Sequence, residues 1–482
     1  MNSWPQRREA TGQRAWPWIA SGLMLSGLHV VLWLVSSRFG SDTPVGERPV
    51  LSLTAILLLG GWVLLVTVYL TRLEARSRVI LAWMVVVGVG MRSAMLVSTP
   101  MLEDDFYRYL WDGGLSANGY NPYTHSPAEV IRGSARVPDP LIGLARSGHP
   151  VIGRINNPEV RSIYPPVAQG LFALSYALRP WSLHAWRCLL LVFDGITLIL
   201  VLTVLRSLGR SDLWAALYWW NPLVIKEVVN SAHLDVACIP FVFCAVIWAL
   251  RGKAVPAAVA LGLGVGVKVW PVVLAPVVVS CAARHGKRLL PAIALFLGMV
   301  GAMAALVYAS GMDGSSGFSA YAQRWERNDA LFMALRWGVE SVLRVLSWNP
   351  GSAGLISRAL VGAALVGWIG WVCRKPAVDP DETWQRCLSI LAAVFLLSPT
   401  QFPWYYVWVV PFLAICPRGS LILLGVLLPI YYLRFHFEAQ GRQWVFDHWI
   451  VWLEYVPVWG VLWWECAGGK GFYQKVLRGK PF

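Results

Sequence analysis

Long apolar runs, separated by short polar segments, constrain this chain more than any other feature of its sequence. About fourteen runs can be drawn, and several reach the ~20 residues that a helix needs to cross a bilayer. The short pair around Lys268 is either two tilted spans or a re-entrant hairpin. The pattern predicts an all-α polytopic membrane protein with about 12–14 transmembrane helices. The runs cover roughly residues 16–36, 50–70, 79–98, 186–205, 213–229, 235–250, 254–267, 270–283, 289–309, 353–373, 384–398, 404–416, 419–433 and 448–465.

Composition excludes a soluble domain and a nucleic-acid-binding protein. Hydrophobic residues make up 57% of the 482 residues and charged residues only 14%, against about 25% charged residues in soluble domains. The net charge of +15 is not gathered in a basic stripe with interleaved aromatics, the pattern typical of nucleic-acid binding. The eight cysteines form no Cys-x-x-Cys pair, which indicates neither a disulfide framework nor a thiolate metal site. We expect one integral membrane domain over residues 1–482.

The distribution of Lys and Arg predicts the orientation of the chain. Arg7, Arg8 and Arg14 precede a first run that is long enough to span the membrane, so this end does not resemble a cleaved signal peptide. With the N-terminus in the cytoplasm, the positive-inside rule is satisfied. The basic inner loops are then 72–78, 206–210, 251–253, 284–288 and 374–375, together with the C-terminal tail. The two longest polar loops, 99–185 and 310–350, are extracytoplasmic.

Three consecutive acids, Glu103, Asp104 and Asp105, open the first outer loop a few residues after the third apolar run. Adjacent carboxylates at the mouth of a membrane span repel one another and are hard to desolvate. Such groups commonly meet a substrate, a cation or a partner charge. The short aromatic stretch from Phe106 to Trp111 follows, and we expect it to form an interfacial helix.

Other charged residues gather toward the same predicted membrane face. Arg92 lies near the outer end of the third run, and Lys226 near the outer end of the fifth. Both Arg92 and Lys268 either snorkel to the interface or bind an anionic substrate. His233 and Asp235 stand where the sixth run begins, and they either form a structural pair or line a site. The predicted topology brings these residues and the three acids to one amphipathic site.

Several short motifs follow one another along most of the chain. They are Glu103 to Gly113, Gly119 to Tyr123, Ile163 to Gln169 (with Tyr164-Pro165-Pro166), Ser231 to Asp235, Lys268-Val269-Trp270-Pro271, and Ser398 to Tyr406 (with Pro403-Trp404-Tyr405). In this order they resemble the motifs of bacterial mannosyltransferase-like proteins of the GT-C superfamily.

This resemblance implies a GT-C-like bundle and a glycosyltransferase that takes its sugar, with mannose favoured, from a polyprenyl-phosphate carrier. The acceptor would be a hydroxyl of a lipid- or glycan-linked molecule, at the extracytoplasmic face of the bacterial cytoplasmic membrane. The partners would be this donor, this acceptor and membrane lipids, with no nucleic acid. Trp404 and Tyr405 have a simpler alternative, an interfacial aromatic belt. The substrate-binding residues that we expect are Glu103, Arg108, Arg92, Tyr164, Lys226, His233, Asp235, Lys268, Trp404 and Tyr405.

A carboxylate of the first outer loop would be the general base, and we expect Asp104, with Asp105 as the next candidate. A sugar hydroxyl is a poor nucleophile, so a carboxylate within hydrogen-bond reach helps by accepting its proton. The leaving lipid phosphate develops negative charge, which Arg or Lys stabilises in a water-poor site. A single displacement inverts the anomeric carbon and requires one base. Neighbouring acids raise the pKa of Asp104, whereas an i,i+4 pair with Arg108 would lower it.

The acids are adjacent, whereas some GT-C enzymes use a spaced Asp-x-Asp pair to hold a divalent cation. Adjacent side chains on a helix point about 100° apart, so joint metal binding is less natural. We expect no obligatory metal and no other cofactor.

Two alternatives remain open. A secondary transporter or lipid or glycan flippase also carries charges within the membrane, but here they collect near one face and no inverted repeat is apparent. A polysaccharide polymerase or ligase also joins lipid-linked glycans outside the membrane. Its expected signature is Arg-rich late outer loops rather than acids after the third span, and Arg324 and Arg327, in the second outer loop, keep it open.

Overall fold

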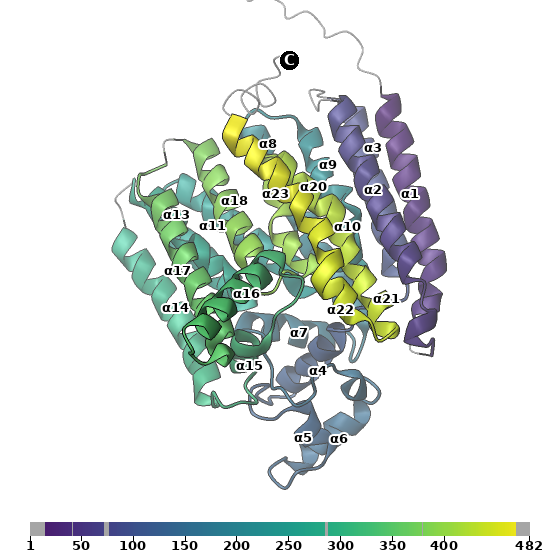
Figure 1. Cartoon of the computed structure of the whole chain (residues 1–482), viewed down its shortest axis with the longest axis vertical. Helices are drawn as coiled ribbons and strands as arrows, with labels where there is room; N and C mark the ends of the chain where they lie inside the picture. Colours follow the sequence, from purple (N-terminus) through teal and green to yellow (C-terminus); the bar gives the residue numbers. More distant parts are fainter. Residues whose placement is uncertain (1–14, 41, 72–76, 285–287, 378, 469–482) are drawn as a thin grey trace, which may run out of the picture.

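The computed structural model describes residues 15–40, 42–71, 77–284, 288–377 and 379–468. Within these ranges the chain is built of helices, and its β-structure is limited to an isolated bridge between Arg327 and Thr400. Figure 1 shows the long helices side by side along one direction, with a smaller helical lobe at one end. The predicted all-α membrane fold is confirmed. Basic residues of the predicted inner segments such as Arg7, Arg72 and Lys470 lie outside the described residues.

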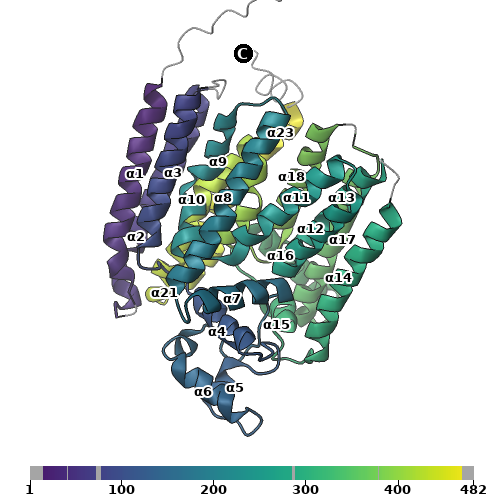
Figure 2. The same ribbon diagram turned by 180° about the vertical axis from the view of Figure 1, so that it is seen from behind.

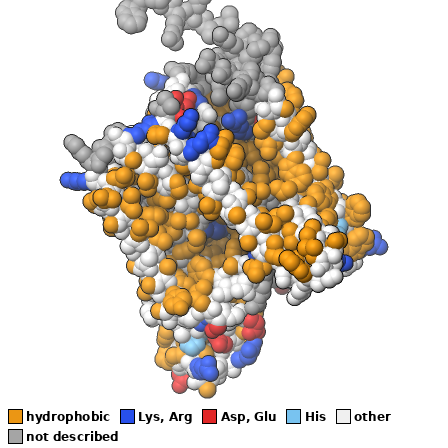
Figure 3. Space-filling model, turned by 60° about the vertical axis from the view of Figure 1, so that its left-hand side comes forward, with side chains coloured by type: hydrophobic (Ala, Val, Ile, Leu, Met, Phe, Trp, Pro, Cys, Tyr) orange, Lys and Arg blue, Asp and Glu red, His pale blue; other side chains and the backbone are white. Residues whose placement is uncertain are grey.

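Seven described helices are long and apolar enough to cross a membrane. They are α1 (Trp16–Ser36), α2 (Val50–Thr71), α3 (Arg78–Leu96), α8 (Leu183–Ser207), α14 (Leu289–Ala309), α17 (Ala353–Cys373) and the segment Gly419–Ala439. In α14 only 6% of the apolar window is buried inside the protein, so most of its surface is available to lipid. Figure 3 shows hydrophobic side chains over the flank of the bundle, with Lys and Arg near the end where α1 begins.

Two helices joined by a sharp bend form an eighth span if they are counted together. The segments Pro222–Asn230 and Leu234–Leu250 meet at an angle of 99°. Between them, Ala232 has a φ of +58°, in the left-handed region that non-glycine residues seldom adopt. The bend therefore places His233 between two helices rather than within one.

The other predicted runs are helical but short, interrupted or too polar. The helix α12 (Ala254–Val267) has only 14 residues. The runs at 270–283 and 404–416 begin with 3-10 turns that contain Pro271 and Pro403. Proline has no backbone N–H to donate and clashes with the preceding turn, so neither run forms one long regular helix. By length and composition, the described residues contain seven or eight candidate spans, fewer than the about 12–14 expected from the runs.

The two predicted outer loops meet at one end of the bundle, where Arg161 N–H donates to Ser315 O at 2.9 Å. Figures 1 and 2 show this end opposite the start of α1 and the end of α23 (Val451–Gly468). The stretch expected to be helical from Phe106 to Trp111 is the first half of α4. The first loop contains α4 (Phe106–Ala117), α5 (Pro127–Ile131), α6 (Asp139–Ser147) and α7 (Pro166–Leu178); the second contains α15 (Gly317–Arg324) and α16 (Ala330–Val345).

Close packing of α4 on α7 fixes the helix that follows the three acids. A Cβ added at Gly113 would lie 2.4 Å from the carbonyl oxygen of Phe172, so a larger residue would force the two helices apart. Asp112 is buried, and its carboxylate accepts hydrogen bonds from Ser162 and, at 3.2 Å, from Gln169. These contacts hold the first turns of α4 and therefore the position of the acids.

A buried ion pair joins α3 to α8. Arg92 Nε lies 2.5 Å from Asp194 Oδ2, and the side chains are 4% and 0% exposed. The Arg92 guanidinium also donates to the carbonyl oxygen of Trp219 at 2.7 Å, and Tyr218 donates to Asp194. Arg92 was predicted to bind substrate, but it does not line the cavity described below. Its position supports a structural role, because its charge is already satisfied inside the bundle.

A second buried arginine ties the start of the first outer loop to the bend near His233. Arg187 Nη1 donates to the carbonyl oxygens of Leu96 at 2.9 Å and Ser98 at 2.8 Å, and its Nη2 donates to that of Asn230. The Asn230 side chain in turn accepts from Met101 N–H at 2.9 Å. The backbone just before the acids is thus attached to the bent span.

Candidate active site

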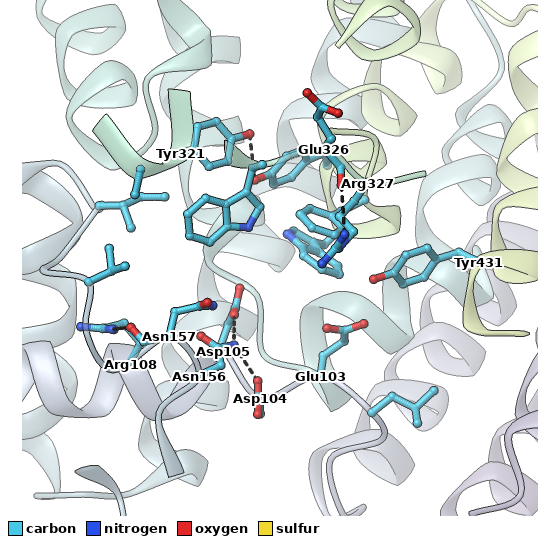
Figure 4. Close-up of a pocket in the computed structure, with 18 of the residues that line it drawn as sticks. Glu103, Asp104, Asp105, Arg108, Asn156, Asn157, Tyr321, Glu326, Arg327 and Tyr431 are labelled. Atoms are coloured by element: carbon cyan, nitrogen blue, oxygen red, sulfur yellow. Dashed lines mark hydrogen bonds between the residues drawn. The ribbon is translucent and has the colours of Figure 1, made fainter. Parts of the chain in front are cut away.

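A cavity of about 470 Å³ lies between the two outer loops and the segment that follows Pro403. Figure 4 shows the three acids on one side of this cavity and Glu326 and Arg327 on the other. Its lining is Leu102, Glu103, Asp104, Asp105, Arg108, Asn156, Asn157, Val160, Ile163, Tyr164, Ala320, Tyr321, Trp325, Glu326, Arg327, Phe402, Trp404, Tyr405, Tyr431, Arg434 and Phe435.

The two aspartates are held by a single amide. Asn156 Nδ2 donates to Asp104 Oδ1 at 2.7 Å and to Asp105 Oδ1 at 2.9 Å. Asp105 is also the N-cap residue of α4, where the positive end of the helix favours a negative charge. The pair therefore remains close together in spite of its like charges.

Burial raises the pKa values of two of the three acids that form one wall of the cavity, called the acid wall below. Burial, with the charge of Asp105 as the next cause, raises the pKa of Asp104 to about 6. Burial also raises the pKa of Glu103 well above its ordinary value, against the opposing charge of Lys226. A carboxyl group with a pKa near 6 is ionised at neutral pH and is more basic than an ordinary aspartate.

His233 lies directly behind the acids, although it does not line the cavity. Its ring stacks on that of Trp404 at 4.2 Å with an interplanar angle of 9°. Its Nδ1 is 3.8 Å from Asp105 Oδ2, and its Nε2 is 3.2 Å from Glu227 Oε2. His233 is fully buried, so it connects the acid wall to charges inside the bundle.

Lys226 is part of this interior group and not of the cavity wall. It is completely buried, and its Nζ lies 3.1 Å from Glu227 Oε1 and 4.2 Å from the centre of the Tyr432 ring. The side chain of Glu227 also accepts a hydrogen bond from Tyr432. The predicted direct contact of Lys226 with substrate is therefore not supported, because its charge is already paired.

Lys268 and Asp235 support the aromatic part of the wall. Lys268 Nζ lies 2.6 Å from Asp235 Oδ1, which also accepts from Trp408 Nε1 at 2.6 Å. The same ammonium group is 4.5 Å from the centre of the Tyr405 ring. Lys268 and Asp235 are one side chain removed from the cavity, and Tyr405 itself lines it.

Arg108 lines the cavity but does not pair with Asp104. Its Nη2 donates to the carbonyl oxygen of Asn157 at 3.1 Å. The i,i+4 pair was expected from an unbroken helix, but α4 begins only at Phe106, so Asp104 precedes the helix. The expected residues that line the cavity are Glu103, Asp104, Asp105, Arg108, Tyr164, Trp404 and Tyr405.

The sequence analysis did not assign several residues of the cavity to the site. Asn156 and Arg434 were not singled out at all, and Arg327 was noted only for the polymerase alternative. Arg327 is held by backbone hydrogen bonds to Pro399 and Gln401, and its guanidinium forms no ion pair with a described carboxylate. The turn signal at Asn157-Pro158 marks this part of the loop but not the function of Asn156. The side chain of Arg324 lies outside what the structure describes.

The two sides of the cavity suit different parts of a reaction. The acid wall can accept a proton. Trp404 lies between the stacked rings of His233 and Phe402, each at 4.2 Å, so its two faces are covered inside the protein. Arg327 supplies positive charge opposite the acids (Figure 4), and Arg434, which pairs with Glu438 at 3.4 Å, also lines the cavity. The arrangement can therefore hold a hydroxyl near a base and an anionic leaving group near two guanidinium groups.

Comparison with known proteins agrees with this chemistry. A family model described as "Alpha-(1->6)-mannopyranosyltransferase, N-terminal domain" matches residues 18–284, more than half of the chain. The match includes the three acids and His233, whereas Arg327, Trp404 and Arg434 lie beyond it. No curated protein and no solved structure matches the chain significantly.

Proposed function

The chain belongs to the alpha-(1->6)-mannopyranosyltransferase family, and we propose that it transfers mannose from a polyprenyl-phosphate carrier to a hydroxyl of a lipid- or glycan-linked acceptor. The observation that carries this proposal is the cavity in which three acids face Arg327, with Arg434 also in its lining. The leaving group can be the phosphate of a lipid carrier instead of a nucleotide. Both leave through an anionic phosphate oxygen, which the two guanidinium groups would contact.

The reaction proposed is a single displacement. The acceptor oxygen attacks the anomeric carbon of mannose while Asp104 takes the hydroxyl proton. The bond between that carbon and the phosphate oxygen breaks, and the phosphate leaves with the bonding electron pair. Arg327 and Arg434 stabilise the charge that develops on it. Attack opposite the leaving group inverts the configuration at the anomeric carbon.

Asp105, Asn156 and His233 would keep the base in position. Asn156 holds the two aspartates at hydrogen-bond distance, and His233 contacts Asp105 from behind. Asp105 is the alternative base, since it lines the same cavity. Because the aspartates are adjacent and share one amide donor, we keep the expectation that no divalent metal is obligatory.

The donor assay tests the function directly. We expect purified protein to consume short-chain polyprenyl-phosphate mannose with an acceptor extract, and to ignore a nucleotide-linked mannose. Arg327→Gln should raise the KM for the donor about tenfold or more, since charge-assisted hydrogen bonds are worth roughly 1.5–3 kcal/mol. Arg132→Gln is the matched control, because this arginine is 63% exposed and does not line the cavity. Transfer from the nucleotide sugar alone would reject the proposed donor.

We propose that the cavity opens on the extracytoplasmic side. The basic inner loops support this orientation, and so does the placement of the first outer loop at the end opposite the start of α1 (Figure 2). A cysteine introduced in place of Ile131, whose side chain is 54% exposed, should react with an impermeant thiol reagent added outside intact cells. Labelling at this position only after the cells are opened would show that the loop is cytoplasmic, and the proposed orientation would be rejected.

A further inference from the structure

A second cavity of about 340 Å³ adjoins the first and has no assigned role. Both cavities are lined by Glu326 and Arg327, so this short segment separates them. Its volume is at the lower end of the range of about 300–1,000 Å³ that ligand pockets span. The lining residues are Glu326, Arg327, Asn328, Asp329, Met333, Arg336, Trp337, Glu340, Phe446, Asp447 and Val451.

The lining contains hydrogen-bonding capacity that the protein does not use. Asn328 is only 5% exposed, and its Nδ2 donates to Glu454 at 2.8 Å and to the carbonyl oxygen of Gln401 at 3.2 Å. Its Oδ1 has no hydrogen-bond partner within the described part of the chain. This oxygen is itself fully buried, and an unpaired buried acceptor is unfavourable. Burial, with Glu326 as the next cause, raises the pKa of Asp329 to about 7.

An aromatic side chain forms another part of the wall. Trp337, on α16, lines the cavity and is 42% exposed. Its ring stacks at 5.9 Å on that of His448, which limits its freedom to move. A flat apolar ring beside amide and carboxylate acceptors matches a sugar, whose ring has an apolar C–H face and a rim of hydroxyl donors.

The charge of the lining distinguishes a sugar from a phosphate. Four carboxyl groups (Glu326, Asp329, Glu340 and Asp447) and two guanidinium groups line the cavity. Glu326 pairs with Arg336 and Glu340 with Arg344, whereas Asp329 and Asp447 form no ion pair among the described residues. This balance disfavours an anionic ligand and leaves acceptors available for neutral hydroxyl groups.

We propose that this second cavity is a saccharide subsite, which holds the non-reacting sugar units of the acceptor while its reacting hydroxyl lies at the acids. The inference rests on the proposed function for the identity of the acceptor. The donor contains one sugar and a phosphate. A glycan acceptor contains further neutral sugar units, so it is the reactant that needs a second site for them. Glu326 and Arg327, labelled in Figure 4, line both cavities, so the chain of sugars would run past these two side chains from one cavity to the other.

Binding of a free oligosaccharide tests the subsite without catalysis. Alpha-(1->6)-linked mannotriose is titrated into the detergent-solubilised full chain and followed by saturation-transfer NMR. Trp337→Ala should weaken binding about tenfold, the scale of a lost aromatic contact with its buried surface. Asp329→Asn should also weaken it. Trp348→Ala, which removes a tryptophan that is 64% exposed and outside both linings, is the matched control and should bind like the native chain.

Equal mannotriose affinity in Trp337→Ala, Asp329→Asn and the native chain would overturn the subsite, and so would a native chain that binds no mannotriose. Kinetics separate this failure from failure of the proposed function. Trp337→Ala should lower the ratio of kcat/KM for a lipid-linked trisaccharide acceptor to that for a monosaccharide acceptor about tenfold. An unchanged ratio in an active enzyme rejects the subsite alone. Native protein that binds mannotriose but transfers no mannose supports the subsite and rejects the transfer reaction.

Discussion

Asp104→Asn is expected to slow mannose transfer by about 10²-fold or more, the contribution typical of a general base. The substitution keeps the shape of the side chain and removes its ability to take the acceptor proton. Donor binding should change little, because the guanidinium group of Arg327 lies on the opposite side of the cavity. Single-turnover rates with saturating polyprenyl-phosphate mannose, together with donor affinity, measure the two effects separately.

Two further variants control this assignment. Glu103→Gln should have a milder effect, since Glu103 shares the wall but is not the predicted base. Near-normal turnover in Asp104→Asn with an inactive Asp105→Asn would transfer the role to Asp105. Full activity in both single variants and in the double variant would remove the base from this loop.

The pKa of Asp104 also predicts the dependence of activity on pH. The pKa is raised to about 6, so the carboxylate is present above this pH and is protonated below it. Because the base must be ionised, kcat/KM should fall about tenfold per pH unit as the pH drops below about 6. The fall should be absent from the residual activity of Asp104→Asn if this group causes it.

Asp194→Asn is expected to destabilise the protein by about 3–5 kcal/mol, the usual cost of breaking a buried ion pair. The replacement leaves the Arg92 guanidinium, which is 3% exposed, without a carboxylate partner inside the bundle. The apparent unfolding temperature of the detergent-solubilised protein and its folded yield are the measurements. A large loss of stability, with donor affinity retained in the folded fraction, fits the structural role.

The control for this prediction is an ion pair between the last turn of α8 and the segment that follows it. Asp212→Asn breaks the pair with Arg206, whose side chain is 60% exposed. Surface pairs contribute about 0–1 kcal/mol, so this variant should unfold close to the native temperature. Similar losses of stability in the two variants would show that the loss in Asp194→Asn is not caused by the burial of the Arg92–Asp194 pair.

The sequence predicts the convergence of the site better than its detailed contacts. Apolar runs locate the helices, and charged residues near their ends indicate which segments meet; Asp105, His233 and Trp404 do lie against one another. Arg92 is different, because its partner Asp194 is in the middle of an ordinary apolar run and carries no periodic signal. Hydropathy also gives more apolar runs than the seven or eight candidate spans among the described residues, since it does not register breaks at residues such as Pro271.

Contacts made by irregular loops could not be predicted from local sequence. Asn156 meets the aspartates across about fifty positions of a loop, and nothing in its neighbourhood specifies that path. Arg434 reaches the cavity from the segment Gly419–Ala439, far along the chain. Such contacts depend on how the two outer loops pack, which is decided by tertiary interactions rather than by spacing.

The hydrogen bonds of Arg187 have a thermodynamic consequence for the active site. They join the end of α3, the first outer loop and the bend beside His233 through carbonyl oxygens that would otherwise lack donors. These hydrogen bonds therefore hold the acids and His233 in one rigid unit. The conformational entropy of these residues is lost when the chain folds, before any substrate binds. A substrate that enters the cavity meets carboxylates already in place, so its binding energy orients the sugar and not the protein.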